Sequence, residues 1–411
     1  MNVSTRSRRP SGFGGNRQRR HRPDYWLVIL SSIMLVIGLI VVYAISPALS
    51  AQQNVGDNYY INKQLVAVVL GIVGFIAVAN LPVKWWRRLE TPLVAIAALA
   101  AIAVRLFGEQ VNGAYRWIQI GGFSFQAAEL IKFALLVWLA GFLTDRLRNN
   151  EINNQAKTFK PLLIILFLVA IVVGKLESDL GSSAVIFAIM AAMVFVAGLP
   201  LKRIFIIGSV VLAGSALLIV STGYRRARFE TFLNPARDCQ NAGYQSCKAL
   251  ITVGSGGMFG KGLGRGVQAY GYLPEAANDS IFAIFAEKFG FIGVSALLGL
   301  FIAFFSRLKH IIERAPDTYS RLLVTGILAW LSTQTLINVG AMIGLMPMKG
   351  ITLPFISYGG TSVLFVTVAI GICFQVSRYT TYTEQSERDQ LKGTDDLGYG
   401  SRKVAYRSAT N

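Results

Sequence analysis

Residues 25–46 read YWLVILSSIMLVIGLIVVYAIS, an uncharged run that is long enough to cross a bilayer as a helix. Similar runs recur along the 411-residue chain, of which 53% is hydrophobic and 15% charged, so a soluble protein is excluded. Backbone groups in lipid must pair within their own segment, and these runs lack the alternation of barrel strands. The sequence therefore predicts an all-α polytopic membrane protein.

We expect about ten transmembrane helices, and nine is the alternative because the third, fifth and sixth are short or weakly bounded. The expected spans are residues 25–46, 63–81, 91–106, 126–144, 159–174, 182–199, 203–221, 280–306, 319–345 and 355–377. One long loop, about 222–279, separates the seventh from the eighth. The chain then divides into a basic tail (1–24), a membrane domain (25–380) and a second tail (381–411).

Lysine and arginine placement predicts the orientation. The termini and the loops on their side carry 26 basic residues, whereas the short loops opposite carry 5. Because cytoplasmic loops of membrane proteins are enriched in these residues, both termini are expected in the cytoplasm and the long loop outside. The 7 basic residues of that loop do not alter this interpretation, since long segments translocate largely regardless of charge.

The Arg-rich tail, residues 1–24, is expected to lie against anionic lipid headgroups rather than to bind nucleic acid. It is not expected to be a cleavable signal, because the helix after it is too long. In the outward loop, Cys239 and Cys247 leave a disulfide and two thiols equally open. Both histidines, His21 and His310, fall on the cytoplasmic side, which excludes a histidine-based metal site outside.

Asp279 is the most suggestive proton acceptor in the sequence. It ends the stretch YLPEAAND (272–279), where the long polar loop enters an apolar segment that starts at Ile281. A carboxylate there would lie at the rim of the membrane. The alternative is a helix N-cap, and the two roles are compatible because a helix N-terminus would keep the carboxylate ionised. Glu275 is either a solvated loop acid or a second participant.

Two pairs of charges fall inside apolar segments, where ionisable residues are functional candidates by default. Glu129 and Lys132 are three residues apart, so they share a helix face and can neutralise each other; a structural ion pair and a site role both remain open. Glu287 and Lys288 are adjacent, so they point in different directions and need separate partners.

The run GSGGMFGKGLGRG (254–266) does not have the spacing of a nucleotide-binding P-loop and is expected outside the cell. Its glycines would let the backbone approach a ligand closely, with Lys261 and Arg265 nearby for anions; a flexible surface loop is the alternative. Lys349 is a lone cation in a short outward loop, and Ser357 follows among small residues. The functional interpretation of these two residues is a phosphate pocket. The structural alternative is that the lysine snorkels and the small residues allow close helix packing.

Three blocks of sequence closely resemble the SEDS family of bacterial shape, elongation, division and sporulation proteins. They are GAYRWI (113–118) with GFSFQAAELIK (122–132), then YLPEAANDSIF (272–282), and finally KGITLPFISYGGTS (349–362). The resemblance runs from Asp24 to about Tyr379. Ala127-Ala128 departs from the family's usual Pro-Ser, and Ser280 stands where the family usually has Phe. The last block resembles the division-type branch (FtsW) more than the elongation-type branch (RodA).

The resemblance implies a peptidoglycan glycosyltransferase in the bacterial cytoplasmic membrane that polymerises lipid II, a disaccharide-pentapeptide on undecaprenyl pyrophosphate. It implies Asp279 as the general base and a class B penicillin-binding protein transpeptidase as the partner. The implied substrate-binding residues are Arg116, Glu129, Lys132, Lys261, Arg265, Glu275, Lys349 and Ser357. No cofactor is demanded, although a divalent cation (Mg²⁺ or Mn²⁺) is an open alternative. A lipid II flippase and a scaffold for the transpeptidase are the rival functions.

Overall fold

The computed structural model describes residues 19–20, 22–111, 114–120, 123–176, 179–220, 223–233, 239–241 and 243–380. The helices are α1 (Tyr25–Gln53), α2 (Tyr59–Asn80), α3 (Lys84–Phe107), α4 (Ala127–Arg148), α5 (Lys160–Val169), α6 (Leu180–Val196), α7 (Leu201–Val220), α8 (Gly223–Leu233), α9 (Tyr244–Ser255), α10 (Ile281–Glu313), α11 (Thr318–Met342) and α12 (Gly360–Ser377). Two π-helical turns, η1 (Gln155–Phe159) and η2 (Ala170–Leu176), flank α5. Most of the basic tail and residues 381–411 lie outside the described residues, so the expectations for both tails stay predictions.

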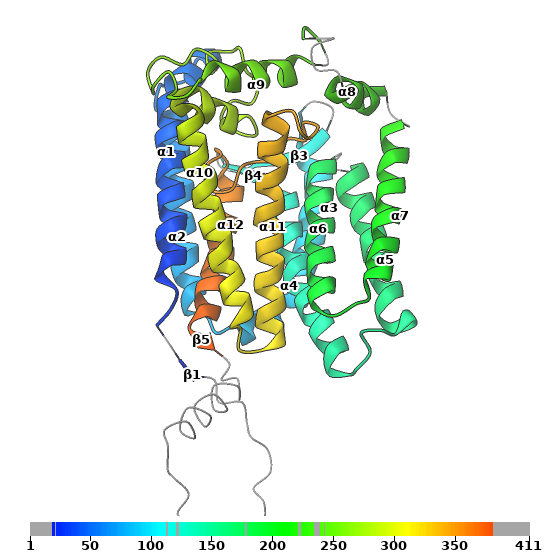
Figure 1. Ribbon diagram of the computed structural model, residues 1–411. Helices are drawn as coiled ribbons and strands as arrows, with labels where there is room; N and C mark the ends of the chain where they lie inside the picture. Colours follow the sequence, from blue (N-terminus) through cyan, green and yellow to red (C-terminus); the bar gives the residue numbers. More distant parts are fainter. Residues whose placement is uncertain are drawn as a thin grey trace, which may run out of the picture.

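The long helices run side by side as a bundle, which confirms the all-α membrane fold (Figure 1). Among the described residues, eight helical segments are long and apolar enough to cross a membrane by length and composition. The shorter α6 and the neighbouring α7 coincide with the other two expected spans. Each of the ten spans predicted from the sequence therefore corresponds to a helix in the bundle.

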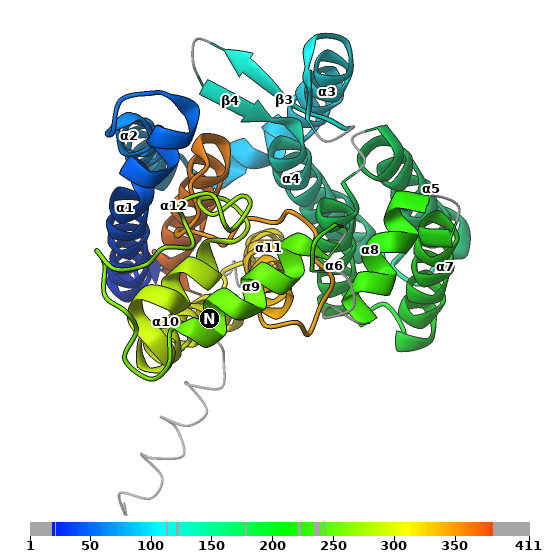
Figure 2. The same cartoon turned by 90° about the horizontal axis from the view of Figure 1, so that it is seen from above.

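The centre of the bundle is formed by α4, α11 and α12, seen from above in Figure 2. In the most apolar stretch of α4, 83% of the residues are buried, against 11% in α3. The outer helices instead expose large apolar side chains such as Leu99 and Phe107. Such a surface is stable only where an apolar solvent covers it, as lipid does in a membrane.

Both ends of the described chain meet on one side of the bundle, as both termini were predicted to do (Figure 1). There β1 (Arg19–Arg20) pairs with β5 (Tyr379–Thr380) in antiparallel fashion. Asp24 accepts a hydrogen bond from the Nε of Arg307 at 2.9 Å, and its backbone N–H donates to the hydroxyl of Ser377 at 3.0 Å. These contacts tie α1, α10 and α12 together at that face.

The opposite face carries the long loop and a small sheet that the sequence did not predict. The loop contains α8 and α9, which lie across this end of the bundle (Figure 1), and the disulfide between Cys239 and Cys247. The sheet is antiparallel and three-stranded, formed by β2 (Glu109–Val111), β3 (Ala114–Ile120) and β4 (Phe123–Gln126). Its place directly before α4 puts Arg116, on β3, at this face.

The span expected at 280–306 is interrupted, which corrects the prediction of one continuous helix. Gly290 has φ 65° and ψ −167° inside α10, so Ile281–Phe289 is a separate half-helix. All residues from Ile281 to Lys288 are buried. Only a glycine fits at 290, because a Cβ there would collide with the backbone nitrogen of Gly260. The half-helix is thus enclosed by protein, and the longer part of α10 follows it.

The span expected to begin at 355 also needs correction, because α12 begins only at Gly360. Residues 349–359 turn back as irregular backbone, and Phe355 adopts a left-handed φ of 67°. The reason is long-range hydrogen bonding, since the Tyr358 N–H donates to the Ala277 carbonyl at 2.9 Å. This segment therefore packs on the turn that carries Asp279.

Candidate active site

Asp279 lies at the end of a tight turn and directly before the half-helix. The Asn278 and Ser280 N–H groups donate to the Glu275 carbonyl at 3.0 and 3.1 Å, and Glu275 adopts a left-handed φ of 51°. The Asn338 side chain of α11 donates to the Asp279 carbonyl at 2.7 Å. These contacts fix the backbone of Asp279. The residue as a whole is buried, with 8% of its surface exposed.

The carboxyl group of Asp279 is buried but weakly hydrogen-bonded. Its Oδ1 accepts from the Gln245 amide at 3.5 Å and from the Ser280 hydroxyl at 3.4 Å, both at the long limit for hydrogen bonds. Burial, with the nearby Glu275 carboxylate as a smaller cause, raises the pKa of Asp279 to about 7. Those two hydrogen bonds oppose this shift.

The capping interpretation of Asp279 is wrong, because Ser280 occupies the N-cap position of α10 and makes no side-chain capping bond. The expectation that the helix N-terminus would keep the carboxylate ionised also fails. Desolvation of a buried charge can shift a carboxyl pKa by several units, and here burial is the largest cause of the shift. Asp279 is consequently poised to exchange a proton near neutral pH.

Arg116 lies beside this carboxyl group, and Lys349 is close to it in the chain. A Cβ placed on Gly350 would lie 3.7 Å from the Oδ2 of Asp279 and 3.8 Å from an Nη of Arg116, so both charged groups border the same glycine. Gly350 has φ 65°, a conformation that favours glycine. The half-buried Lys349 directly precedes it. The structure thus brings together a carboxyl and a guanidinium from distant sequence blocks, with a lysine next to them in the chain.

Glu275 and Ser357 flank Asp279 in different ways. Glu275 is exposed and accepts a hydrogen bond from the Asn278 amide at 2.6 Å. Ser357 is buried, donates its hydroxyl hydrogen to the Asn278 carbonyl at 2.6 Å, and accepts from the Leu353 N–H at 2.7 Å. The hydroxyl of Ser357 therefore joins residues 349–359 to the Asp279 turn, and its predicted contact with substrate stays a prediction.

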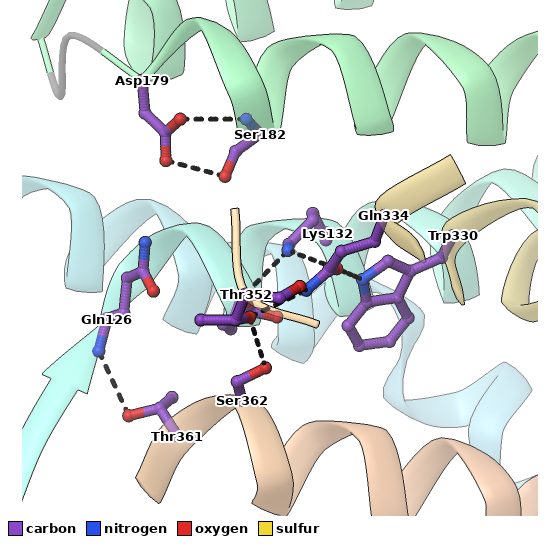
Figure 3. A network of polar contacts seen from close by, with 10 residues as sticks. Gln126, Lys132, Asp179, Ser182, Trp330, Gln334, Thr352, Thr361 and Ser362 are labelled. Atoms are coloured by element: carbon purple, nitrogen blue, oxygen red, sulfur yellow. Dashed lines mark hydrogen bonds and ion pairs between the residues drawn. The ribbon is translucent and has the colours of Figure 1, made fainter. Parts of the chain in front are cut away.

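Glu129 and Lys132 form the ion pair that their spacing predicted, at 2.8 Å in α4, with both side chains almost fully buried. Lys132 also donates to the side-chain oxygen of Gln334 at 3.2 Å (Figure 3). Gln334 in turn donates to the Thr352 carbonyl at 3.0 Å. Because Thr352 is two residues beyond Gly350, this network links the ion pair in α4 to the segment that lies beside Asp279.

Figure 3 shows how the same network spans the three central helices. The indole N–H of Trp330 donates to Gln334 at 2.7 Å, and the Thr352 and Ser362 hydroxyls are 3.1 Å apart. A separate bond, from the Gln126 N–H to the Thr361 hydroxyl at 3.3 Å, joins β4 to the start of α12. Helices α4, α11 and α12 are thereby held in one register around residues 349–359.

Lys261 and Arg265 lie away from Asp279. The Lys261 ammonium is 3.3 Å from a carboxylate oxygen of Glu287, and Arg265 is exposed in the same loop. Glu287 is eight residues beyond Asp279, or roughly 12 Å along the helix axis. Lys288 instead donates to the Leu263 carbonyl at 2.7 Å, so the prediction of separate partners for Glu287 and Lys288 is confirmed. The structure does not bring Lys261 and Arg265 to the Asp279 cluster.

Sequence reasoning missed Gln245, Gln334 and Asn338. Asn338 is 2% exposed and bridges the Asp279 carbonyl to the Ile351 carbonyl, with N···O distances of 2.7 and 2.6 Å. A usable signal was present, because Gln334 and Asn338 are four residues apart in an apolar helix and must share a face. Gln245 lies in GYQ (243–245), which also resembles the SEDS family, but this run does not predict a contact with Asp279, because the position of the loop helix depends on distant contacts.

No group of three or more histidine, cysteine, aspartate or glutamate side chains gathers anywhere in the described part of the chain. Asp279 and Glu275 supply two carboxylates on one turn, fewer protein ligands than a divalent cation site made of protein alone would use. A divalent cation here would need further oxygens, from water or from a bound ligand.

The model of the FtsW/RodA/SpoVE family of cell cycle proteins matches residues 25–382. The chain belongs to this family. Among its relatives, the probable peptidoglycan glycosyltransferase FtsW of Saccharophagus degradans is 38% identical over 88% of this chain and 94% of the relative. The stage V sporulation protein E of Bacillus subtilis is 36% identical over 89% of this chain and 99% of the relative.

Solved structures of similar proteins share the fold. A chain from a peptidoglycan synthase complex, described as coordinating polymerization and crosslinking, has a TM-score of 0.70 at 27% identity. It is matched over 87% of this chain and 98% of its own length. The rod shape determining protein RodA of Thermus thermophilus has a TM-score of 0.62 at 27% identity, over 87% and 97% of the two chains. The family match confirms the resemblance, and its range includes every predicted site residue.

Proposed function

We propose that this protein is a peptidoglycan glycosyltransferase that polymerises lipid II at the outer face of the bacterial cytoplasmic membrane during cell division. The names of its FtsW relatives support the activity and the division role, and each of these relatives is matched over most of its length. The single observation that carries the chemistry is the buried Asp279 carboxyl, with a pKa of about 7. An elongation role like that of RodA is the nearest alternative.

In the proposed reaction Asp279 is the general base. The 4-hydroxyl oxygen of one sugar forms a bond to the anomeric carbon of the growing strand, while the bond from that carbon to pyrophosphate breaks. The hydroxyl proton passes to Asp279, and the electron pair of the broken bond leaves with the pyrophosphate. A base with a pKa near the working pH is the most effective, and such catalysis contributes roughly 10²- to 10⁴-fold.

Positive charge should stabilise the departing pyrophosphate, which is already a good leaving group and needs no protonation by a second carboxyl. Arg116 and Lys349 are proposed for this task because they border or precede Gly350 beside Asp279. Lys132 is already paired with Glu129, so we propose that it acts through Gln334 and Thr352. A divalent cation held near Asp279 or Glu275 would share the task of neutralising the charge on the pyrophosphate.

We further propose that a class B penicillin-binding protein transpeptidase is the partner and that both termini are cytoplasmic. The first proposal is supported by the similar fold of a peptidoglycan synthase complex described as coordinating polymerization and crosslinking. The second is supported by the 26 basic residues on the side where the described chain ends meet. Depletion of the protein distinguishes the two branches, because filamentous cells indicate division and round cells indicate elongation.

The test is polymerisation of purified lipid II in liposomes by wild type and Asp279→Asn, each with its cognate transpeptidase. Asparagine is nearly isosteric with aspartate, so folding should survive while the base is lost. Glycan strands from wild type and none from a folded variant would support the proposal. Normal polymerisation by the variant would refute the role of Asp279. Inactive wild type with its partner would favour the flippase, if lipid II crosses the bilayer, or the scaffold, if it does not. Repeating the assay with a chelator and with added Mg²⁺ or Mn²⁺ tests the cation.

A further inference from the structure

The glycine-rich run 254–266 binds the protein itself. Its backbone pairs with the end of the half-helix: the Lys261 and Gly262 N–H groups donate to the Glu287 and Lys288 carbonyls at 2.9 and 3.0 Å. In the other direction, the Phe291 N–H donates to the Gly257 carbonyl at 2.8 Å. These contacts correct the interpretation of this run as a flexible surface loop, whereas its approach to a ligand stays a prediction.

The glycines are needed because the two backbones touch. A Cβ on Gly256 would collide with the Ala286 carbonyl, and one on Gly260 would collide with the Lys288 carbonyl. A Cβ on Gly266 would lie 2.8 Å from the second carboxylate oxygen of Glu287. Close approach of the loop to the half-helix thus explains three glycines in the run.

Glu287 is at the centre of this contact. Its residue is 0% exposed, and its Oε1 accepts from the Lys261 ammonium and from the Val267 N–H, both at 3.3 Å. Lys288, pointing elsewhere, donates to the Leu263 carbonyl. A buried carboxylate is costly unless it is paired and hydrogen-bonded, so the loop and the half-helix each satisfy a polar group of the other.

Helix α9 connects this contact to the active site. It runs from Tyr244 to Ser255, directly before the loop, and packs along α10. Near its start Gln245 donates to the Asp279 carboxyl and to the Ser280 hydroxyl, at 3.5 and 3.4 Å. At its end Gly256 lies against Ala286. The helix and the half-helix thus run parallel to each other, joined at Asp279 and again at Glu287.

We propose that Glu287 is a positioning residue for the glycosyl transfer. By holding the loop 256–267 on the half-helix, it fixes α9 and keeps Gln245 over the carboxyl group of Asp279. Glu287 itself is roughly 12 Å from the base and contacts no reacting atom. We call the contact of Glu287 with the loop 256–267 the clamp. The kinetic consequence of the clamp rests on the proposed function, whereas the clamp itself is a property of the fold.

The clamp is tested by hydrogen exchange of the full-length protein in liposomes, which assumes nothing about the reaction. Glu287→Ala should speed exchange in 256–267 and in α9, whereas Glu287→Gln, which keeps an acceptor for Lys261 and Val267, should restore most of the protection. The matched control is Glu313→Ala, an exposed glutamate at the other end of α10. Unchanged exchange in Glu287→Ala would overturn the inference, even if wild type proves inactive in polymerisation.

The kinetic test is the pH–rate profile of lipid II polymerisation with the cognate transpeptidase. Glu287→Ala should lower the rate roughly 10- to 100-fold, as expected for a catalytic group displaced by about 1 Å. Loss of the Gln245 hydrogen bond should also move the acidic limb to higher pH, with Glu275 and Arg116 the other charged groups near Asp279. Gln245→Leu should give the same shift. A lower rate with an unmoved limb would overturn positioning and leave a structural role only.

Because Glu287→Ala could fail to fold, Gly266→Ala provides a second variant. Its methyl group crowds Glu287 without removing any charge, so it should loosen the same loop and move the acidic limb in the same direction. A folded Gly266→Ala protein with wild-type exchange and a wild-type pH profile would overturn the proposal independently.

Discussion

Asp279 and Glu129 are both buried carboxyl groups in apolar surroundings, but their hydrogen-bond and ion-pair partners differ. Glu129 is 2% exposed and has the Lys132 ammonium at 2.8 Å, which in turn bonds Gln334. Asp279 is 8% exposed, and its Oδ1 accepts from two neutral donors, the Ser280 hydroxyl and the Gln245 amide, at 3.4 and 3.5 Å. The first carboxylate is neutralised within the fold, and the second keeps the capacity to take a proton.

The difference lies in which neighbours are close in sequence. A partner three residues away on the same helix is guaranteed by helical geometry, so Glu129 cannot avoid Lys132. The neighbours of Asp279 come from β3, α9, α11 and residues 349–359, and each was brought there by tertiary packing. A carboxyl group without a partner close in sequence, such as Asp279, thus owes its environment to tertiary packing.

The largest expected effect concerns the rate. Asp279→Asn should lower lipid II polymerisation at pH 8 roughly 10²- to 10⁴-fold, because a general base contributes about that much. In wild type the rate should fall as the pH drops below about 7, where the carboxyl becomes protonated. The residual rate of the variant should lack this limb. A limb that persists in Asp279→Asn would assign the titration to another group.

Next in size is the loss of the ion pair in α4. Lys132→Met should lower the free energy of unfolding by about 3–5 kcal/mol, since it leaves the Glu129 carboxylate buried without its cation. The double variant Glu129→Leu, Lys132→Met should recover most of this loss. Thermal unfolding in detergent measures both. A double variant as unstable as the single one would mean that Lys132 stabilises mainly through Gln334.

The same comparison predicts that removing the charge of Asp279 raises the free energy of unfolding, whereas removing the charge of Lys132 lowers it. Its pKa is raised when folded, so the unfolded chain releases the proton first, and stability falls as the pH rises from about 4 to about 7. Above pH 7, Asp279→Asn should therefore be more stable than wild type, by about 4 kcal/mol. Melting temperatures measured from pH 4 to 8 should diverge with increasing pH. A constant difference would contradict the linkage.

A smaller effect is expected at Asn338. Asn338→Leu leaves the Asp279 and Ile351 carbonyls without their buried donor, at a cost of about 1–3 kcal/mol. It should also slow polymerisation, because the Asp279 turn and the Gly350 segment are no longer joined. Thr335→Val, which removes a bond within α11 only, is the matched control and should not affect the rate. Equal rates for both variants would show that the bridge does not position the base.

Much of the fold could be predicted because the membrane makes apolar length decisive. The ten spans, the pairing of Glu129 with Lys132 and the shared side of both chain ends follow from local composition and helical geometry. The sheet carrying Arg116 could not be predicted, since its strands gain stability from one another. Nor could the break at Gly290, where the deciding neighbour, Gly260, lies thirty residues earlier in the chain.

At the site, the sequence by itself determined which residues are unusual: an aspartate at the rim of a membrane and cations where lipid is expected. The tertiary structure alone decided what surrounds each of them. It placed Arg116 beside Asp279, used Ser357 and Lys261 in internal contacts, and added Asn338 and Gln245. The physical reason is that a pKa and a hydrogen bond depend on distance and desolvation, and both are set by segments far apart in the chain.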